Sequence, residues 1–163
     1  MKRGVNLREE FGPVMQPGER YTLVVATTLR DAEGQPLARD FRRTFIATAE
    51  MHARLDLAGW KLQAPRAGTR EPLRVVATAP LDHALALRCL RVRGVEGGAA
   101  LADDGREWSF TPASPWKAAT HTLSADAWLE DLAGNTFERV FDNDMTAAPG
   151  RVPQTSREFA PSR

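Results

Sequence analysis

The sequence predicts an all-β fold, and three observations lead to this prediction. Between residues 20 and 145, short runs of β-branched and apolar residues are separated by turn residues, with no sustained helical period. Residues 121–135 repeat the pattern of residues 21–35 without a gap. The strand-like runs recur about every ten residues, which is typical of a β-sandwich.

The composition of the 163-residue chain indicates a globular protein of one or two small domains. Apolar residues make up 42% of the chain and charged residues 26%, so a core can be buried. The 22 Lys and Arg residues balance 21 Asp and Glu residues, and the charge therefore indicates neither nucleic acid nor a membrane as partner. The single Cys89 excludes an internal disulfide and a cysteine-based zinc cluster, and a buried apolar role suits it.

Residues 1–48 contain two predicted strands joined by a turn. The first strand spans residues 20–28 and is apolar on both faces. The turn at residues 31–34 begins with Asp, which can accept hydrogen bonds from the following backbone, and ends with Gly, which tolerates a positive φ. The returning strand is predicted over residues 41–48.

Residues 49–59 are predicted to be a linker, and residues 60–144 a second, complete unit. The strand candidates in this unit are residues 60–63, 72–78, 87–92, 107–111, 120–128 and 137–142. The Gly-rich residues 94–98 are predicted to be a connection. Residues 145–163 contain three prolines among small and polar residues and are predicted to form a flexible tail.

The repeat relates the first part of the chain to the rear half of the second unit. The matched positions are Tyr21, Leu23, Leu29, Asp31, Gly34 and Gln35 with His121, Leu123, Leu129, Asp131, Gly134 and Asn135. A two-stranded sheet alone leaves one apolar face bare. We therefore expect a homodimer through the N-terminal edge strands, with packing on the second unit, or a monomer with an exposed apolar end, as the alternatives.

Three motifs of the second unit carry a family resemblance. They are Pro80-Leu81-Asp82, Trp108-Ser109-Phe110-Thr111-Pro112 and Asp131-Leu132-Ala133-Gly134-Asn135. In this order they resemble the immunoglobulin-like domains of bacterial S-layer and other surface proteins. The resemblance implies an immunoglobulin-like β-sandwich over residues 60–144, with a partial, rear-half copy at about residues 17–45.

The resemblance also implies a function and a location. The chain is expected to be a noncatalytic structural or interaction module from a larger bacterial surface protein. Such domains are secreted or attached to the cell surface, whereas the start of this chain shows no signal-peptide pattern.

Oxygen-bearing side chains near the end of the second unit suggest a calcium site. They are Glu130, Asp131, Asn135, Asp142 and Asp144. Grouped hard oxygen ligands suit calcium, but the spacing differs from an EF-hand loop. Turn formation alone also explains Asp131.

A small calcium-dependent hydrolase is the alternative function. A metal-bound water could attack an ester or lactone carbonyl, with Asp82, His83 and Asp131 as candidate catalytic residues. The carboxylate of Asp82 could orient His83 as a general base, or it could cap the Pro-Leu-Asp turn.

The absence of common catalytic motifs excludes several enzyme classes, and the tryptophans suggest one class of ligand. The sequence has no Gly-x-Ser-x-Gly, His-Glu-x-x-His, Cys-x-x-Cys or phosphate-binding Gly loop with its Lys. Trp108 is predicted to lie in the core. Trp116 and Trp128 are predicted to be exposed, where their rings could stack on a carbohydrate.

Overall fold

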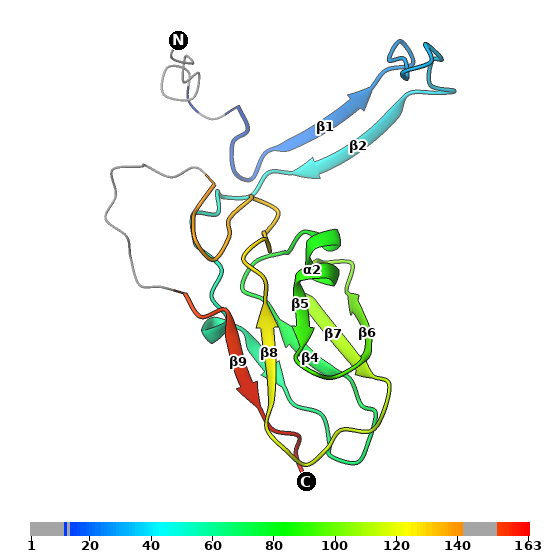
Figure 1. Ribbon diagram of the computed structural model, residues 1–163. Coiled ribbons are helices and arrows are strands. Elements are labelled where there is room, and N and C mark those ends of the chain that lie inside the picture. Colours follow the sequence, from blue (N-terminus) through cyan, green and yellow to red (C-terminus); the bar gives the residue numbers. More distant parts are fainter. Residues whose placement is uncertain (1–11, 13, 142–152) are drawn as a thin grey trace, which may run out of the picture. The chain divides into compact units, whose positions relative to one another are not determined.

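The protein is mostly β in the residues that its computed structural model describes, namely residue 12, residues 14–141 and residues 153–163 (Figure 1). These residues form nine strands in three antiparallel sheets, one seven-residue α-helix and one 3-10 turn. The predicted all-β class is confirmed. None of the helices in these residues is long and apolar enough to cross a membrane.

The chain divides into two compact units, Met1–Glu50 and Met51–Arg163. In the first unit, strands β1 (Arg20–Val25) and β2 (Phe41–Ile46) form an antiparallel hairpin. Tyr21 lies opposite Phe45, and their rings stack with centroids 6.1 Å apart. Because side chains alternate between the faces of a strand, directly opposed residues share one face of the hairpin.

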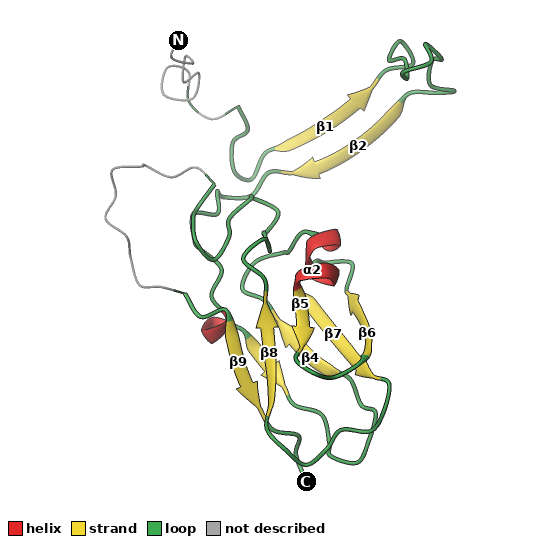
Figure 2. Ribbon diagram, in the orientation of Figure 1, coloured by secondary structure: helices red, strands yellow, loops and turns green. Residues whose placement is uncertain are grey.

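The second unit contains two sheets (Figure 2). The four-stranded sheet has the order β3-β4-β7-β6, and the three-stranded sheet has the order β5-β8-β9. The strands are β3 (Lys61–Gln63), β4 (Leu73–Val76), β5 (Leu90–Val92), β6 (Gly97–Leu101), β7 (Glu107–Pro112), β8 (His121–Ala125) and β9 (Ser156–Phe159).

One hydrophobic core joins the two sheets of the second unit. The four-stranded sheet contributes Leu73, Val75 and Trp108, and the three-stranded sheet contributes Val92 and Leu123. These side chains are buried and recur at every second position along their strands. Burial of alternating apolar residues therefore holds the two sheets together.

A short helix replaces part of the strand predicted over residues 87–92. Helix α2 spans His83–Cys89, and only Leu90–Val92 form β5. Asp82 begins the helix, because its Oδ1 accepts a hydrogen bond from the backbone N–H of Leu85 at 2.8 Å. The cap and the spacing of the buried Ala86 and Cys89 explain why a helix forms here.

Part of the linker predicted over residues 49–59 packs into the second unit. Leu55 and Leu57 are fully buried in the core of the second unit. The N–H of Leu55 donates to the carbonyl of Thr136, and Asp56 caps the 3-10 turn η1 (Leu57–Gly59). Apolar side chains therefore anchor this segment to the second unit.

The returning strand of the second unit lies later in the sequence than predicted. No strand forms over residues 137–141, and Asp142 lies outside the described residues. Instead β9 pairs with β8 and buries Phe159. The flexible tail predicted over residues 145–163 is therefore wrong for the residues of β9, since a buried aromatic residue and a strand partner order them.

The Gly-rich connection predicted over residues 94–98 ends inside a strand. β6 begins at Gly97, which lies opposite Pro112 of β7. A Cβ atom at position 97 would lie 2.3 Å from the carbonyl oxygen of Thr111. Only glycine allows the two backbones to approach this closely.

Candidate functional site

The carboxylate of Asp131 is buried and hydrogen-bonded within its own loop. Its Oδ1 accepts from the backbone N–H groups of Ala133 at 2.8 Å and Asn135 at 2.9 Å. Its Oδ2 accepts from Nδ2 of Asn135 at 2.9 Å. Both oxygens therefore stabilise the loop.

Asn135 connects this loop to two other segments of the second unit. Its Nδ2 also donates to the carbonyl of Met51, and its Oδ1 accepts from the N–H of Phe141. The side chain is fully buried, and both of its polar atoms have protein partners. Asn135 thus has a structural role at the position where the sequence suggests a calcium ligand.

The other predicted calcium ligands do not complete a site in the described residues. Glu130 contributes its backbone carbonyl, which accepts from the N–H of Asp82. Asp142 and Asp144 lie outside the described residues. Across the part of the chain that the structure describes, no three His, Cys, Asp or Glu side chains are grouped so that they could hold a metal ion.

We expect the melting temperature to be the same in calcium and in a chelator, because Asp131 and Asn135 already have protein partners. A calcium site filled at 100 times its Kd would add about 2.7 kcal/mol to the free energy of unfolding. Differential scanning calorimetry measures the difference. A melting temperature that rises with calcium concentration would contradict this expectation.

The candidate catalytic pair Asp82 and His83 lies at the start of α2. Asp82 has the structural role that the sequence suggested as one alternative, but it caps helix α2 and not only the Pro-Leu-Asp turn. His83 is the first residue of the helix and is exposed. The pair thus lies at a helix terminus. The hydrogen bond from the N–H of Leu85 explains why an aspartate is present at position 82.

The loop around Asp131 has a counterpart around Asp31 in the first unit. Oδ1 of Asp31 accepts from the N–H groups of Glu33 at 3.1 Å and Gln35 at 2.8 Å. The N–H of Asp31 donates to the carbonyl of Gln35, as that of Asp131 donates to the carbonyl of Asn135. The two loops therefore share these hydrogen bonds, although Asp31 and Gln35 are exposed whereas Asp131 and Asn135 are buried.

The glycines of these two loops have the same backbone conformation. Gly34 has a φ of 82° and Gly134 a φ of 80°, a region that other residues rarely adopt. The N–H of each glycine donates to the carbonyl of the aspartate three residues earlier at 3.0 Å. The Asp-x-x-Gly pattern in the sequence thus encodes one turn twice.

The strand pairs that follow the same pattern also share their register. Tyr21 lies opposite Phe45, and His121 lies opposite Phe159. Leu23 lies opposite Arg43, and Leu123 opposite Arg157. The second partner strand was not predicted from the sequence, although Arg43-Thr44-Phe45 and Arg157-Glu158-Phe159 share an Arg-x-Phe signal.

Equivalent residues define an inner face on each hairpin. On β8–β9 the inner face consists of His121, Leu123, Ala125, Arg157 and Phe159. On β1–β2 it consists of Tyr21, Leu23, Val25, Phe41, Arg43 and Phe45. The second set is the larger and more apolar of the two, since it replaces His121 by Tyr21 and adds Phe41.

The two inner faces differ in burial. Leu123 and Phe159 are 0% and 7% exposed in the core of the second unit. Leu23 and Phe45, at the equivalent positions, are 52% and 38% exposed. A contiguous exposed apolar surface of this kind marks an interaction site, so the inner face of β1–β2 is the first candidate functional surface.

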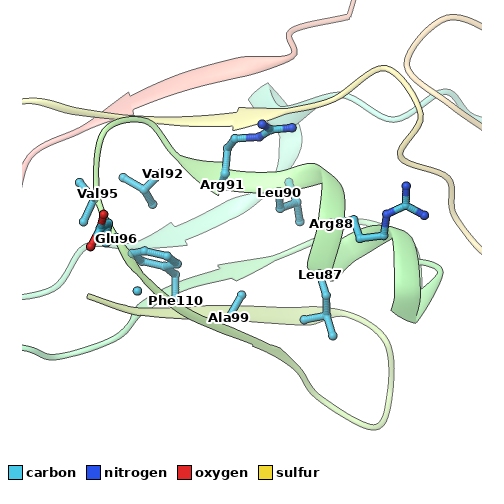
Figure 3. Close-up of a pocket in the computed structure, with 10 residues that line it drawn as sticks. Leu87, Arg88, Leu90, Arg91, Val92, Val95, Glu96, Ala99 and Phe110 are labelled. Atoms are coloured by element: carbon cyan, nitrogen blue, oxygen red, sulfur yellow. The ribbon is translucent and has the colours of Figure 1, made fainter. Parts of the chain in front are cut away.

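A groove of about 410 Å³ in the second unit is the other candidate (Figure 3). Leu90 and Val92 of β5 line one side, and Ala99 and Phe110 of β6 and β7 line the other. The guanidinium of Arg91, at the edge, makes a 3.4 Å ion pair with Asp126. The groove is an open gap between the two sheets, and charged side chains such as Arg88 and Glu96 line it together with the apolar ones.

The tryptophans do not form the exposed pair that the sequence suggested. Trp108 is buried in the core, as expected. Trp116 is also buried, which corrects the prediction, because its Nε1 donates to the carbonyl of Glu71 and its ring contacts His121 and Phe159. Trp128 alone of the two is exposed, at 77%.

Cys89 has the environment of a structural residue. It lies on the buried side of α2, and burial raises the pKa of its thiol. The neighbouring Asp126 raises this pKa further, whereas Arg88 and Arg91 lower it. A thiol that stays protonated is a poor nucleophile.

Comparison of the chain with protein-family models, with curated proteins and with solved structures finds no match.

Proposed function

We propose that the chain is a noncatalytic, immunoglobulin-like interaction module whose first hairpin is its binding surface. The observation that carries this proposal is that one antiparallel strand pair occurs twice with the same register, and that the same Asp-x-x-Gly turn follows the first strand of each pair. One copy lies in a two-sheet core, and the other exposes the equivalent side chains. The first unit then corresponds to a partial, rear-half copy of the second.

The architecture of the second unit supports the immunoglobulin-like part of the proposal. Two antiparallel sheets share one core, and Trp108 of the Trp-Ser-Phe-Thr-Pro strand is fully buried in it. The Asp-Leu-Ala-Gly-Asn motif forms the turn after β8. The resemblance to domains of bacterial surface proteins rests on these motifs, and a place in such a protein is part of the proposal.

The hydrogen bonds of the acidic loop favour a structural module over the calcium-dependent hydrolase. Asp131 binds backbone and side-chain donors of its own loop, and Asp82 caps a helix. Both carboxylates therefore stabilise the fold. The homodimer expected from the sequence is the alternative to a separate binding partner at this surface, and sedimentation distinguishes the two.

A dye that fluoresces on apolar surfaces and an ester substrate test the proposed function together. We expect wild-type protein to bind 8-anilinonaphthalene-1-sulfonate at the inner face of β1–β2. The double variant Leu23→Asp, Phe45→Asp should lose most of this fluorescence and keep the unfolding transition of the tryptophans, which all lie in the second unit. Hydrolysis of a chromogenic ester or lactone that a chelator abolishes would refute the noncatalytic module.

A further inference from the structure

The second unit shows what covers a hairpin of this kind. β5 pairs with the edge of β8 that β9 leaves open, with Leu90 opposite Ala125 and Val92 opposite Leu123. The four-stranded sheet then packs on the inner face through Trp108 and its neighbours. The inner face of β8–β9 thus meets two things, an edge strand and an apolar sheet.

Among the described strands, the first hairpin lacks both of these partners, the additional edge strand and the covering sheet. Within the described residues β1 pairs only with β2, so the edge along Leu23–Val25 has no strand partner there. These residues are the equivalents of Leu123–Ala125, where β5 pairs. An open edge beside an exposed apolar face is a template for strand addition.

We propose that hairpin β1–β2 docks a polypeptide that supplies strands equivalent to β3–β7 of the second unit. This inference rests on the proposed function as an interaction module and names its partner class. One strand of the partner pairs antiparallel with Leu23–Val25 of β1 and carries apolar residues at alternate positions. A second, antiparallel sheet of the partner covers Leu23, Phe41 and Phe45.

Arg43 specifies the partner further. Its equivalent, Arg157, donates from Nη1 to the carbonyl of Trp60 at 2.5 Å, and that carbonyl lies where η1 leads into β3. The inner face of β1–β2 itself holds no acidic residue. The partner therefore presents a turn carbonyl to Arg43 before its first strand, as Trp60 does for Arg157.

Two other occupants fit this surface less well. Two copies of the hairpin packed face to face would bring two Arg43 side chains into one apolar interface without a counter-charge, which is costly. The other occupant would be an outer sheet face of the second unit, but these faces carry charged residues, which match an apolar surface poorly. They are Lys61, Arg74 and Glu107 on one sheet and Arg91 and Glu158 on the other.

A fusion of a front half to the full chain tests this inference. Residues 51–119, which contain β3 to β7 and lack β8 and β9, are joined ahead of Met1 of the complete chain. Hydrogen exchange followed by mass spectrometry then reports on the amides of β1. We expect these amides to exchange at least about tenfold more slowly in the fusion than in the chain alone.

Two variants of the fusion serve as a matched pair. Leu23→Asp places a charge on the inner face and should return β1 to the fast exchange of the chain alone. Val24→Asp places the same charge on the opposite face, next to it in sequence, and should keep the slow exchange. Equal exchange of β1 in the fusion and in the chain alone, or equal effects of the two variants, overturns the inference.

Sedimentation of the unfused chain tests the competing occupant. We expect a monomer, and a dimer that Leu23→Asp dissociates would assign the surface to a second copy instead. Failure of the fusion experiment is distinguishable from failure of the proposed function. Chelator-sensitive ester hydrolysis would refute the module whatever the exchange rates, whereas unchanged exchange without hydrolysis refutes only the partner.

Discussion

Replacement of Leu123 by Ala is expected to lower the free energy of unfolding of the second unit by about 3 kcal/mol. Leu123 is fully buried and belongs to the core between the two sheets. The change removes apolar contacts and leaves a cavity that its strand neighbours fill only in part. Urea denaturation followed by tryptophan fluorescence measures the loss, because all four tryptophans belong to this unit.

Leu23→Ala is the matched control for this prediction. Leu23 occupies the equivalent strand position but is half exposed. We expect a loss below about 0.5 kcal/mol in the same titration, followed by both fluorescence and circular dichroism. A loss as large as that of Leu123→Ala would mean that Leu23 is covered in the free protein, which contradicts an open inner face.

Replacement of Asp131 by Ala is expected to destabilise the second unit by about 3 kcal/mol. The change leaves the N–H groups of Ala133 and Asn135, and Nδ2 of Asn135, without the carboxylate that accepts from them. Buried donors without partners are costly because water cannot replace the lost acceptor. The same urea titration measures this effect.

Asp31→Ala supplies the comparison for Asp131→Ala. Asp31 accepts the equivalent backbone hydrogen bonds in an exposed turn, where water can replace the carboxylate. We expect the tryptophan-reported transition to stay at the wild-type urea concentration. If Asp131→Ala instead left stability unchanged and abolished hydrolysis of an ester, the acidic loop would be a catalytic site and its structural role would be refuted.

The sequence predicted local features of this fold better than tertiary ones. The Asp-x-x-Gly turns, β1, β2 and most strands of the second unit follow from alternation and turn residues. The strand predicted at Phe137 failed, because Phe137 is buried by packing and not by strand pairing. The actual partner, β9, is short and bounded by prolines, so its local pattern carries little weight.

The candidate site shows the same limit. A cluster of oxygen-bearing side chains suggested a metal, but whether a carboxylate binds a cation or its own backbone depends on distances that spacing does not encode. The bare hairpin was expected from the repeat. Its equivalence to β8–β9 could be recognised only in the structure, because the shared Arg-x-Phe signal follows the Asp-x-x-Gly turn at different sequence distances in the two units.

These offsets bear on how the protein could be re-engineered. Phe45 follows Gln35 by ten positions, whereas Phe159 follows Asn135 by 24, yet each aromatic residue reaches the same strand partner. A doubling of loop length costs only about 0.6 kcal/mol in closure entropy. The strands alone therefore dictate their alignment, and the connection after the turn is the place where a foreign epitope or a whole guest domain could be grafted.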